Sequence, residues 1–208
     1  MKKDSILYVV AFTFAVCAFF VFFLALANEA TKERVAANQI FAERVAVLSA
    51  FGMDYATPEE ALEKYGRYIR EKAATAGAEK AWLREENGRV YLAARVTGAG
   101  AWGPISVVVA ADSSLERISG IQVLSHNETP GLGGRIAEAW FSAQFRGERA
   151  GPEGIRITVG AMARGTGDTD PDNGVLDGVS GATRSTQSME TIVNGGIRAI
   201  RTLAEEAR

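Results

Sequence analysis

The chain opens on one long apolar run. Residues Ile6 to Ala27 include no charged side chain, and about 20 apolar residues are enough for a helix to cross the hydrocarbon layer of a membrane. A cleaved signal peptide is the alternative, because Ala25-Leu26-Ala27 resembles a cleavage site. The apolar region of a signal peptide is, however, only about 7–15 residues long. We therefore expect residues 1–27 to form an N-terminal cytoplasmic stub and a retained transmembrane helix.

Two basic residues, Lys2 and Lys3, lie just before this run. Positive charges beside a membrane helix favour the cytoplasmic side. We expect a single-pass protein of the inner (cytoplasmic) membrane with its N-terminus in the cytoplasm. The residues after Asn28 are then expected on the periplasmic or extracytoplasmic side.

Two further helices are predicted beyond the apolar run. From residue 28 to residue 51, apolar side chains recur every three or four positions, which is typical of a helix. Gly52 is suited to end that helix. A second helix is predicted from Pro58 to Ala73, because its first residues have the order of a capping box: Thr57, Pro58 and Glu60. We expect residues 28–77 to form a helical stalk.

Farther along the chain, apolar positions fall into short runs separated by turn residues. Asn87-Gly88 tolerates the positive φ angles of a two-residue hairpin turn, which predicts an antiparallel pair from residues 81–85 and 89–96. Residues 105–110 and 118–124 are rich in β-branched side chains and predict a second antiparallel pair.

The remaining segments predict helices around these strands. We expect a helix over residues 136–145, a strand over 155–159 and a loop over 165–174. Apolar residues from Met189 to Leu203 have helical spacing and predict a C-terminal helix. Hairpins with separate helices predict an α+β fold, in which an antiparallel sheet with flanking helices forms one domain over residues 78–208.

Composition limits the classes of function. The chain has 23 Lys and Arg against 25 Asp and Glu, with a net charge of -2. It therefore lacks the broad positive surface on which nucleic-acid binding depends, and we expect no nucleic-acid partner. Cys17 is the only cysteine, so an intramolecular disulfide and a cysteine metal site are both excluded.

A loop rich in glycine and hydroxyl groups, "DGVSGATRST", runs from Asp177 to Thr186 and leads into the C-terminal helix. Helix N-termini carry unpaired N–H groups and a partial positive charge, and glycines let a ligand approach the backbone. A phosphate site is therefore one interpretation of this loop. The alternative is that Ser180, Thr183 or Ser185 simply caps the helix.

A second loop, "HNETPGLGG", extends from His126 to Gly134 between a predicted strand and a predicted helix. Pro130 and Gly131 fit the two central positions of a type II turn, so a tight connection is one interpretation. The glycine spacing is also similar to the nucleotide motif G-x-G-x-x-G, but Ile136 stands where that motif has its last glycine or alanine.

Together, these two loops behind one membrane span resemble the FMN-binding domain family. That family includes the C-type subunits of the sodium-pumping NADH:quinone oxidoreductase and the G-type subunits of the related Rnf electron-transport complex. Its flavinylation signature is matched by Asp177, Ser180, Gly181, Ala182 and Thr183. The resemblance implies that FMN is joined covalently, through its phosphate, to Thr183. The family's other loop at the flavin is matched by Glu128, Thr129, Pro130, Gly131, Leu132 and Gly133.

The resemblance also implies a function. The chain is expected to be the FMN-carrying electron-transfer subunit of an ion-translocating NADH:quinone oxidoreductase, inactive on its own. Its expected partners are the membrane, the other membrane subunits, and a flavin transferase that uses FAD and recognises Asp177. The N-terminal "KKDSI" and the context "LDGVSGAT" favour the C-type subunits.

Three alternatives remain open. The nearest is a G-type flavoprotein of an Rnf ferredoxin:NAD oxidoreductase complex. A standalone flavinylated domain serving an extracytoplasmic reductase is the second. The third belongs to another class, a membrane-anchored, non-redox binding or scaffold protein whose loops are only a turn and a helix cap.

Some residues have two interpretations each. Trp102 and Trp140 are candidates for stacking on the flavin, although a buried aromatic residue also serves as core. His126, the only histidine, is expected to be a loop residue without a catalytic or ligand role. The acidic loop with Asp168, Asp170 and Asp172 is interpreted either as a cation site or as a solvated loop. We assign no catalytic residue and no metal ligand.

Overall fold

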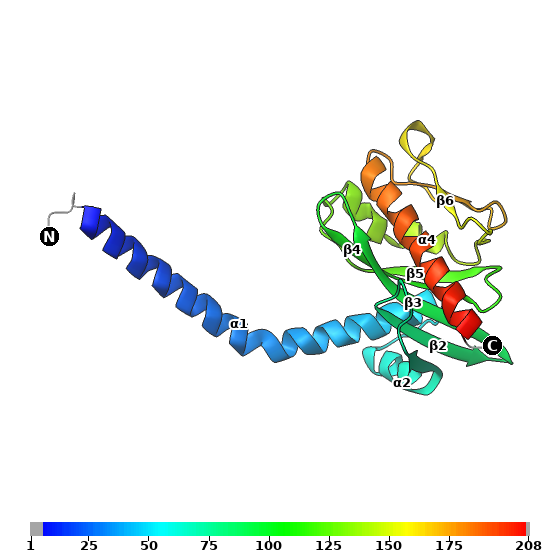
Figure 1. Ribbon diagram of the computed structural model, residues 1–208, viewed down its shortest axis with the longest axis horizontal. Coiled ribbons are helices and arrows are strands. Elements are labelled where there is room, and N and C mark those ends of the chain that lie inside the picture. The colour runs from blue at the N-terminus through cyan, green and yellow to red at the C-terminus, as the bar shows by residue number, and fades with distance from the viewer. Residues whose placement is uncertain (1–5, 207–208) are drawn as a thin grey trace. The chain divides into compact units, whose positions relative to one another are not determined.

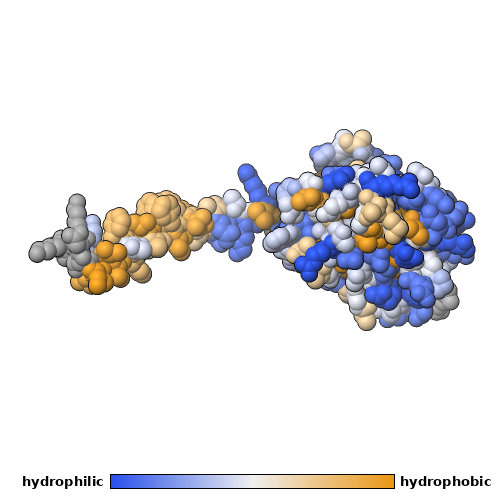
Figure 2. All heavy atoms as spheres, turned by 90° about the horizontal axis from the view of Figure 1, so that it is seen from above, coloured by the Kyte–Doolittle hydropathy of each residue, from blue (hydrophilic) through white to orange (hydrophobic). Residues whose placement is uncertain are grey.

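The computed structural model describes residues 6–206 and contains two compact units that divide between Phe41 and Ala42. The first unit is formed by helix α1, which runs from Ile6 to Ala50 and continues into the second unit (Figure 1). Its apolar part is long and apolar enough to cross a membrane, and none of it is buried in the protein. Figure 2 shows hydrophobic side chains covering this part of the helix. Lys2 and Lys3, which carry the predicted orientation, lie outside the described residues.

The end of α1 is part of the second unit. Gly52 has a φ of +71° there, and its N–H donates to Ser49 O at 3.0 Å while Met53 N–H donates to Leu48 O at 2.9 Å. This pair of bonds satisfies the last carbonyls of a helix, and glycine adopts the required left-handed backbone without strain. The predicted stop at Gly52 is confirmed.

Helix α2 spans Pro58–Tyr68. Its predicted cap is confirmed, because Thr57 Oγ1 accepts a hydrogen bond from Glu60 N–H at 3.2 Å. The predicted end at Ala73 is wrong: the backbone turns extended at Ile69, and Ile69–Lys72 form strand β1. Burial of Ile69 and pairing with the neighbouring strand outweigh the helical propensity of this short polar segment.

Five antiparallel strands form the main sheet in the order β1-β2-β3-β4-β5. The other four strands are β2 (Lys80–Glu86), β3 (Arg89–Ala99), β4 (Pro104–Asp112) and β5 (Ile118–Ser125). Both predicted hairpins are confirmed, and Asn87 and Gly88 have φ angles of 50° and 75°. These positive angles are those of the two-residue turn that the dipeptide favours.

The sheet has a hydrophobic core on each face. Helix α4, Thr183–Glu206, covers one face and contacts β3 and β4. The other face packs against the end of α1 and against α2, around the fully buried Trp82. Residues 42–77 therefore belong to the compact unit, whereas the sequence suggested a separate stalk, because their apolar side chains complete this second core.

Short elements connect the strands to α4. The segment predicted as one helix over 136–145 is two, a 3₁₀ helix η1 at Gly133–Ala137 and helix α3 at Ala139–Ala143. Glu138 separates them because its backbone is extended, with φ -71° and ψ 149°. Strand β6, Arg156–Ile157, is shorter than predicted and pairs in parallel with β7, Val175–Leu176; the 3₁₀ helix η2 spans Gly160–Met162.

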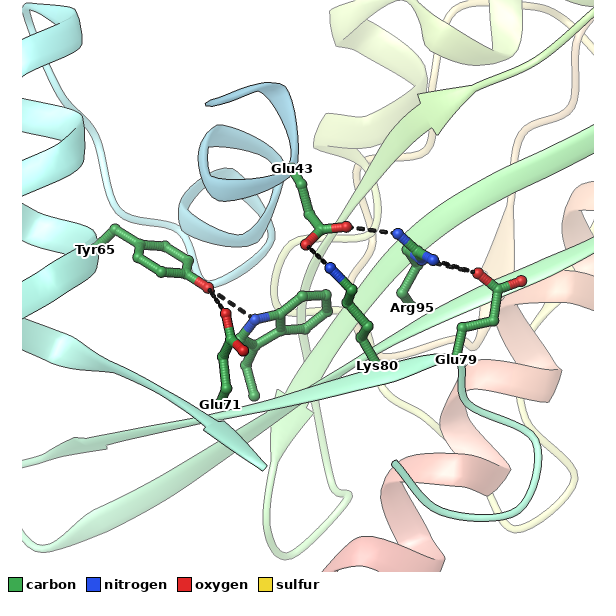
Figure 3. Close-up of polar contacts among 7 residues, drawn as sticks. Glu43, Tyr65, Glu71, Glu79, Lys80 and Arg95 are labelled. Carbon is green, nitrogen blue, oxygen red and sulfur yellow. Dashed lines mark hydrogen bonds and ion pairs between the residues drawn. The ribbon is translucent and has the colours of Figure 1, made fainter. Parts of the chain in front are cut away.

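Polar contacts fasten the end of α1 to the sheet (Figure 3). Glu43 forms ion pairs with Lys80 and Arg95 on neighbouring strands, and Arg95 also pairs with Glu79. A partly buried network of this kind is worth more than isolated surface pairs.

Deeper in the same layer, Trp82 Nε1 donates to Tyr65 Oη at 2.9 Å, and Tyr65 Oη donates to Glu71 at 3.1 Å (Figure 3). Burial and the nearby Glu71 carboxylate raise the pKa of Tyr65 to about 12. The phenol therefore stays protonated at physiological pH and keeps its role as donor to Glu71.

The close contact between α4 and the sheet generates a stability prediction. A Cβ at Gly196 would lie 2.7 Å from Val109 Cγ2 inside the core, so Gly196→Ala should destabilise the protein by about 1–3 kcal/mol through overpacking. Gly195→Ala is the matched control, since only the end of Arg198 lies near it, at 3.8 Å. The control should gain up to about 1 kcal/mol of helix propensity. Denaturant unfolding of the full chain in detergent measures both, and equal stabilities for the two variants would contradict the packing.

Candidate functional site

The loop before α4 is a tight turn. Ala182 N–H donates to Val179 O at 3.0 Å, and Gly181 has a φ of +79° at the third position of this turn. Glycine is favoured there because a side chain is strained at such an angle. The turn brings Thr183 to the first position of α4.

The hydroxyl groups of "SGATRST" divide into two kinds. Ser185 is buried, and its Oγ donates to the Glu128 carboxylate at 2.5 Å. Thr186 is also buried, and its Oγ1 accepts from Val179 N–H at 3.2 Å. Ser180 and Thr183 are exposed. Thr183 is the exposed hydroxyl residue at the helix N-terminus.

The N-terminus of α4 suits an anion. Its first intrahelical bond runs from Thr186 N–H to Ala182 O, at 3.0 Å, so the amides of residues 183–185 precede the hydrogen-bond ladder. The residue at the cap position is Ala182, which has no side-chain oxygen. Neither Ser180 nor Thr183 occupies the cap position. The helix dipole also favours negative charge at this end of α4.

Glu128 joins three segments at this point. It is only 4% exposed, and its Oε1 accepts from the N–H groups of Ala101 and Trp102 at 2.8 and 3.2 Å. Its other oxygen accepts from Ser185 on α4. A buried carboxylate is costly unless hydrogen bonds compensate it, and here three donors do so.

The "ETPGLGG" loop has the predicted turn. Leu132 N–H donates to Thr129 O at 3.2 Å, and Gly131 has a φ of +74°, as a type II turn with Pro130 before it requires. Gly133 is needed for a different reason. A Cβ there would overlap Ser185 Oγ and lie 2.7 Å from Glu128 Oε2. Its missing side chain lets this loop lie directly against α4.

The two loops and the segment around Trp102 enclose a pocket of about 300 Å³. Trp102 and Leu132 are its large apolar residues, 74% and 51% exposed. Trp140 lies elsewhere: its ring faces the Arg135 guanidinium at 5.4 Å and its Nε1 donates to Glu138. Of the two tryptophans considered from the sequence, Trp102 is the one at the pocket.

Most of the predicted site residues meet at this pocket. Those that line it are Glu128, Thr129, Leu132, Gly133, Gly181, Ala182 and Thr183. Those that do not are Pro130, Gly131, Asp177 and Ser180, and all of these except Asp177 belong to the two turns. Sequence reasoning missed Ala101, Arg184 and Ser185 as pocket residues. Of these three residues, only Arg184 could have been found from the sequence, because a positive charge directly after Thr183 suits a phosphate site.

A larger hollow of about 890 Å³ lies between the end of α1 and the hairpin turns. It includes none of the residues predicted for the site, and its lining is a mixture of both charges, among them Arg84, Arg117 and Asp112. Size alone is therefore a poor guide here, and the smaller pocket is the candidate site.

Asp177 supports the site from beneath. The residue is only 7% exposed, and its carboxylate accepts from the N–H groups of Arg164, Thr166 and Gly167 at 2.7, 2.9 and 3.2 Å. Burial by itself raises the pKa of this carboxyl, but the hydrogen bonds from Thr166, Arg164 and Gly167 outweigh it and hold the pKa below its usual value. Asp177 thus fixes the segment 164–167 against the turn that presents Thr183.

Because the pKa of Asp177 is lower in the folded state, its contribution to stability is present above the unfolded pKa and is lost as pH falls through the folded pKa. Asp177→Asn should cost about 1–3 kcal/mol at neutral pH, since buried N–H groups lose acceptors. The variant should also lack the loss of stability that protonation of Asp177 causes at pH values below 3.8, the ordinary pKa of this carboxyl. Urea unfolding across the acid range tests both, with the exposed Asp54→Asn as control. Parallel pH profiles for Asp177→Asn and the unaltered chain would contradict the assignment.

The Glu128 contacts predict a local effect. Glu128→Ala should speed amide hydrogen exchange at Ala101 and Trp102, because both N–H groups lose their acceptor. Exchange measured by NMR on the full chain in detergent provides the test, and the exposed Glu138→Ala is the control. Unchanged exchange at these two amides would show that Glu128 does not hold the segment.

Part of this chain is similar to known proteins. Residues 100–198 match the family model described as "FMN-binding domain". The C-type subunit of the Na(+)-translocating NADH-quinone reductase of Chlamydia trachomatis is 32% identical over 101 residues, which are 42% of this chain and 32% of that protein. The Yersinia pestis protein of the same name is 33% identical over 103 residues, 48% of this chain and 36% of that protein. The chain thus spans about a third of the length of these curated relatives.

Solved structures share the fold. Shewanella oneidensis NqrC has a TM-score of 0.67 at 16% identity, covering 82% of this chain and 99% of that one. The C-type subunit of the Na(+)-translocating NADH-quinone reductase from Parabacteroides distasonis has a TM-score of 0.64 at 20% identity, with 82% and 96% covered. The α+β architecture predicted from the sequence is confirmed by these neighbours. The pocket lies wholly inside residues 100–198, the segment that matches the FMN-binding domain model.

Proposed function

We propose that this chain carries FMN and passes electrons as one component of a Na⁺-translocating NADH:quinone oxidoreductase. The observation that carries the proposal is the exposed Thr183 at the N-terminus of α4, in a pocket within the segment that matches the FMN-binding domain model. The names of the relatives support the choice of complex.

The residues present fit the parts of FMN. A pocket of about 300 Å³ lies at the lower end of the range for small-molecule sites, about 300–1,000 Å³. Phosphate suits the free amides of the α4 N-terminus and the neighbouring Arg184. The planar ring suits Leu132 and Trp102, the apolar residues of the pocket. Bound flavin supplies the redox chemistry, while the chain binds and orients it.

We further propose that the FMN phosphate is esterified to Thr183. A separate Mg²⁺-dependent flavin transferase would use FAD: a bond forms between Thr183 Oγ1 and the FMN phosphorus, the pyrophosphate bond of FAD breaks, and AMP leaves. The hydroxyl proton is released to solvent. Exposure of Thr183 supports access by such an enzyme. Because the Asp177 carboxylate is buried, its contribution to recognition is to hold the turn in shape.

Helix α1 supports a membrane anchor, and Lys2 and Lys3 in the sequence before it support the proposed orientation. We propose that its apolar part anchors a single-pass protein in the inner membrane, with the FMN domain on the extracytoplasmic side. The chain would take electrons from one membrane subunit and pass them to another, and it would be inactive alone. Covalent attachment keeps the cofactor in a compartment where free flavin is dilute and a dissociated one would be lost.

The alternatives differ in observable ways. A G-type protein of an Rnf complex would co-purify with ferredoxin-linked subunits, and the names of the reported relatives favour the first proposal over it. A standalone flavoprotein would carry FMN without co-purifying subunits. A non-redox scaffold would carry none, even in the presence of the transferase.

Removing the hydroxyl at residue 183 tests the attachment. Thr183→Val, made together with a flavin transferase, should lose covalent FMN completely while folding normally, because residue 183 is exposed. Ser180→Ala is the matched control, since its hydroxyl is also exposed and lies in the same turn. Intact-protein mass and peptide mapping provide the measurement.

An FMN-sized adduct on the peptide with Thr183, present in the control and absent in Thr183→Val, is the expected result. An FMN adduct that is retained in Thr183→Val would show that FMN is attached to another residue. An unmodified wild-type chain, under conditions that flavinylate a reference protein, would support the scaffold alternative.

A further inference from the structure

A carboxylate lies in the wall of the candidate FMN pocket. Glu128 lines this pocket together with Leu132 and Thr183, and it is only 4% exposed. Its hydrogen bonds hold three segments of the chain together. A charge at this position also acts on whatever occupies the pocket, because electrostatic interactions are strong where water is excluded.

The hydrogen bonds of Glu128 fit the ionised carboxylate. Oε1 accepts from Ala101 N–H and Trp102 N–H at 2.8 and 3.2 Å, and Oε2 accepts from the Ser185 hydroxyl. An ionised carboxylate accepts through both oxygens and donates through neither. Neutral donors of this kind stabilise the charge without removing it, so the pocket wall carries a full negative charge.

The positive groups near the pocket have another role. Within the described residues 6–206, no ion pair includes Glu128. Arg184 is the basic residue that lines the pocket, and it is exposed, so solvent weakens its effect. The proposed phosphate ester on Thr183 has a negative charge of its own, which Arg184 and the N-terminus of α4 compensate. The Glu128 charge is then left without compensation by a cation.

We propose, on the basis of the FMN function proposed above, that the buried charge of Glu128 lowers the reduction potential of the flavin. Reduction adds two electrons to the flavin ring with one or two protons from solvent, and with one proton the reduced ring is negatively charged. A ring in a pocket of about 300 Å³ lies inside the roughly 8 Å over which charges interact at physiological ionic strength. Glu128 therefore repels the added negative charge, which makes the reduced flavin a stronger electron donor.

Glu128→Gln tests this role because it removes the charge and keeps the hydrogen bonds. The amide oxygen accepts from Ala101 and Trp102, and the amide nitrogen donates to Ser185 Oγ. The flavinylated full chain in detergent is titrated with a chemical reductant and redox mediators, and flavin absorbance reports the midpoint potential. The equilibrium constant for reduction should increase at least about tenfold, a rise of about 30 mV for two electrons.

Two control variants separate charge from structure. Ser185→Ala breaks one hydrogen bond of Glu128 and keeps the charge, so the midpoint potential should not rise. Glu190→Gln removes a carboxylate elsewhere on α4, which accepts from Ile157 N–H at 2.6 Å and does not line the pocket. Its midpoint potential should equal that of the wild type. An equal rise in Ser185→Ala and Glu128→Gln would indicate a loosened pocket and would overturn the inference.

Arg184→Gln is a second variant, which remains available if Glu128→Gln fails to fold. Arg184 is exposed, and its loss leaves the Glu128 charge less opposed, so the midpoint potential should fall. An unchanged or higher potential in that case would overturn the inference. A flavinylated Glu128→Gln chain with the wild-type potential would overturn the inference alone and leave the proposed function standing. A wild-type chain that acquires no FMN in the presence of the transferase would overturn both.

Discussion

The candidate site depends on one buried carboxylate. Glu128 receives hydrogen bonds from the segment at Ala101 and Trp102 and from Ser185 on α4, and it belongs itself to the "ETPGLGG" loop. Three segments far apart in the sequence are thereby held at one charge. Since a buried carboxylate must be compensated, each segment is needed to stabilise the others, and the pocket exists only when all three are in place.

Glycines make this assembly possible, because a backbone without side chains can lie close to the Glu128 carboxylate. Gly133 admits Ser185 and Glu128 into contact, while Gly100 leaves room for the Glu128 carboxylate. A hydroxyl at the start of a 24-residue helix is also a rigid point. Because α4 packs along β3 and β4, a group bonded to Thr183 would be positioned by the main core of the domain rather than by a loose loop.

Local patterns predicted much of this arrangement. The capping residues of α2, the helix end at Gly52, the Asn87-Gly88 hairpin and the Pro130-Gly131 turn were readable because each depends on residues close in sequence. The Glu128–Ser185 bond spans 57 residues and left no sequence signal, since a Ser or Glu with a distant partner looks like any other. Strand β1 was missed for the same reason: its short polar segment favours a helix until the neighbouring strand is present. Asp177 matched a signature, but its burial beneath the turn was visible only in three dimensions.

The end of α1 has a consequence for how the domain can be separated from its membrane anchor. Ala46, Leu48 and Phe51 belong to the core around Trp82, and Glu43 pairs with two strands of the sheet. Cutting the chain after Phe51 would leave only α2 on that face of the sheet and would expose the part that the end of α1 covers, which would be prone to association with other apolar surfaces. A soluble form of the domain therefore has to begin at or before Ala42, so the natural boundary between membrane part and water-soluble part lies within a continuous helix, not at its end.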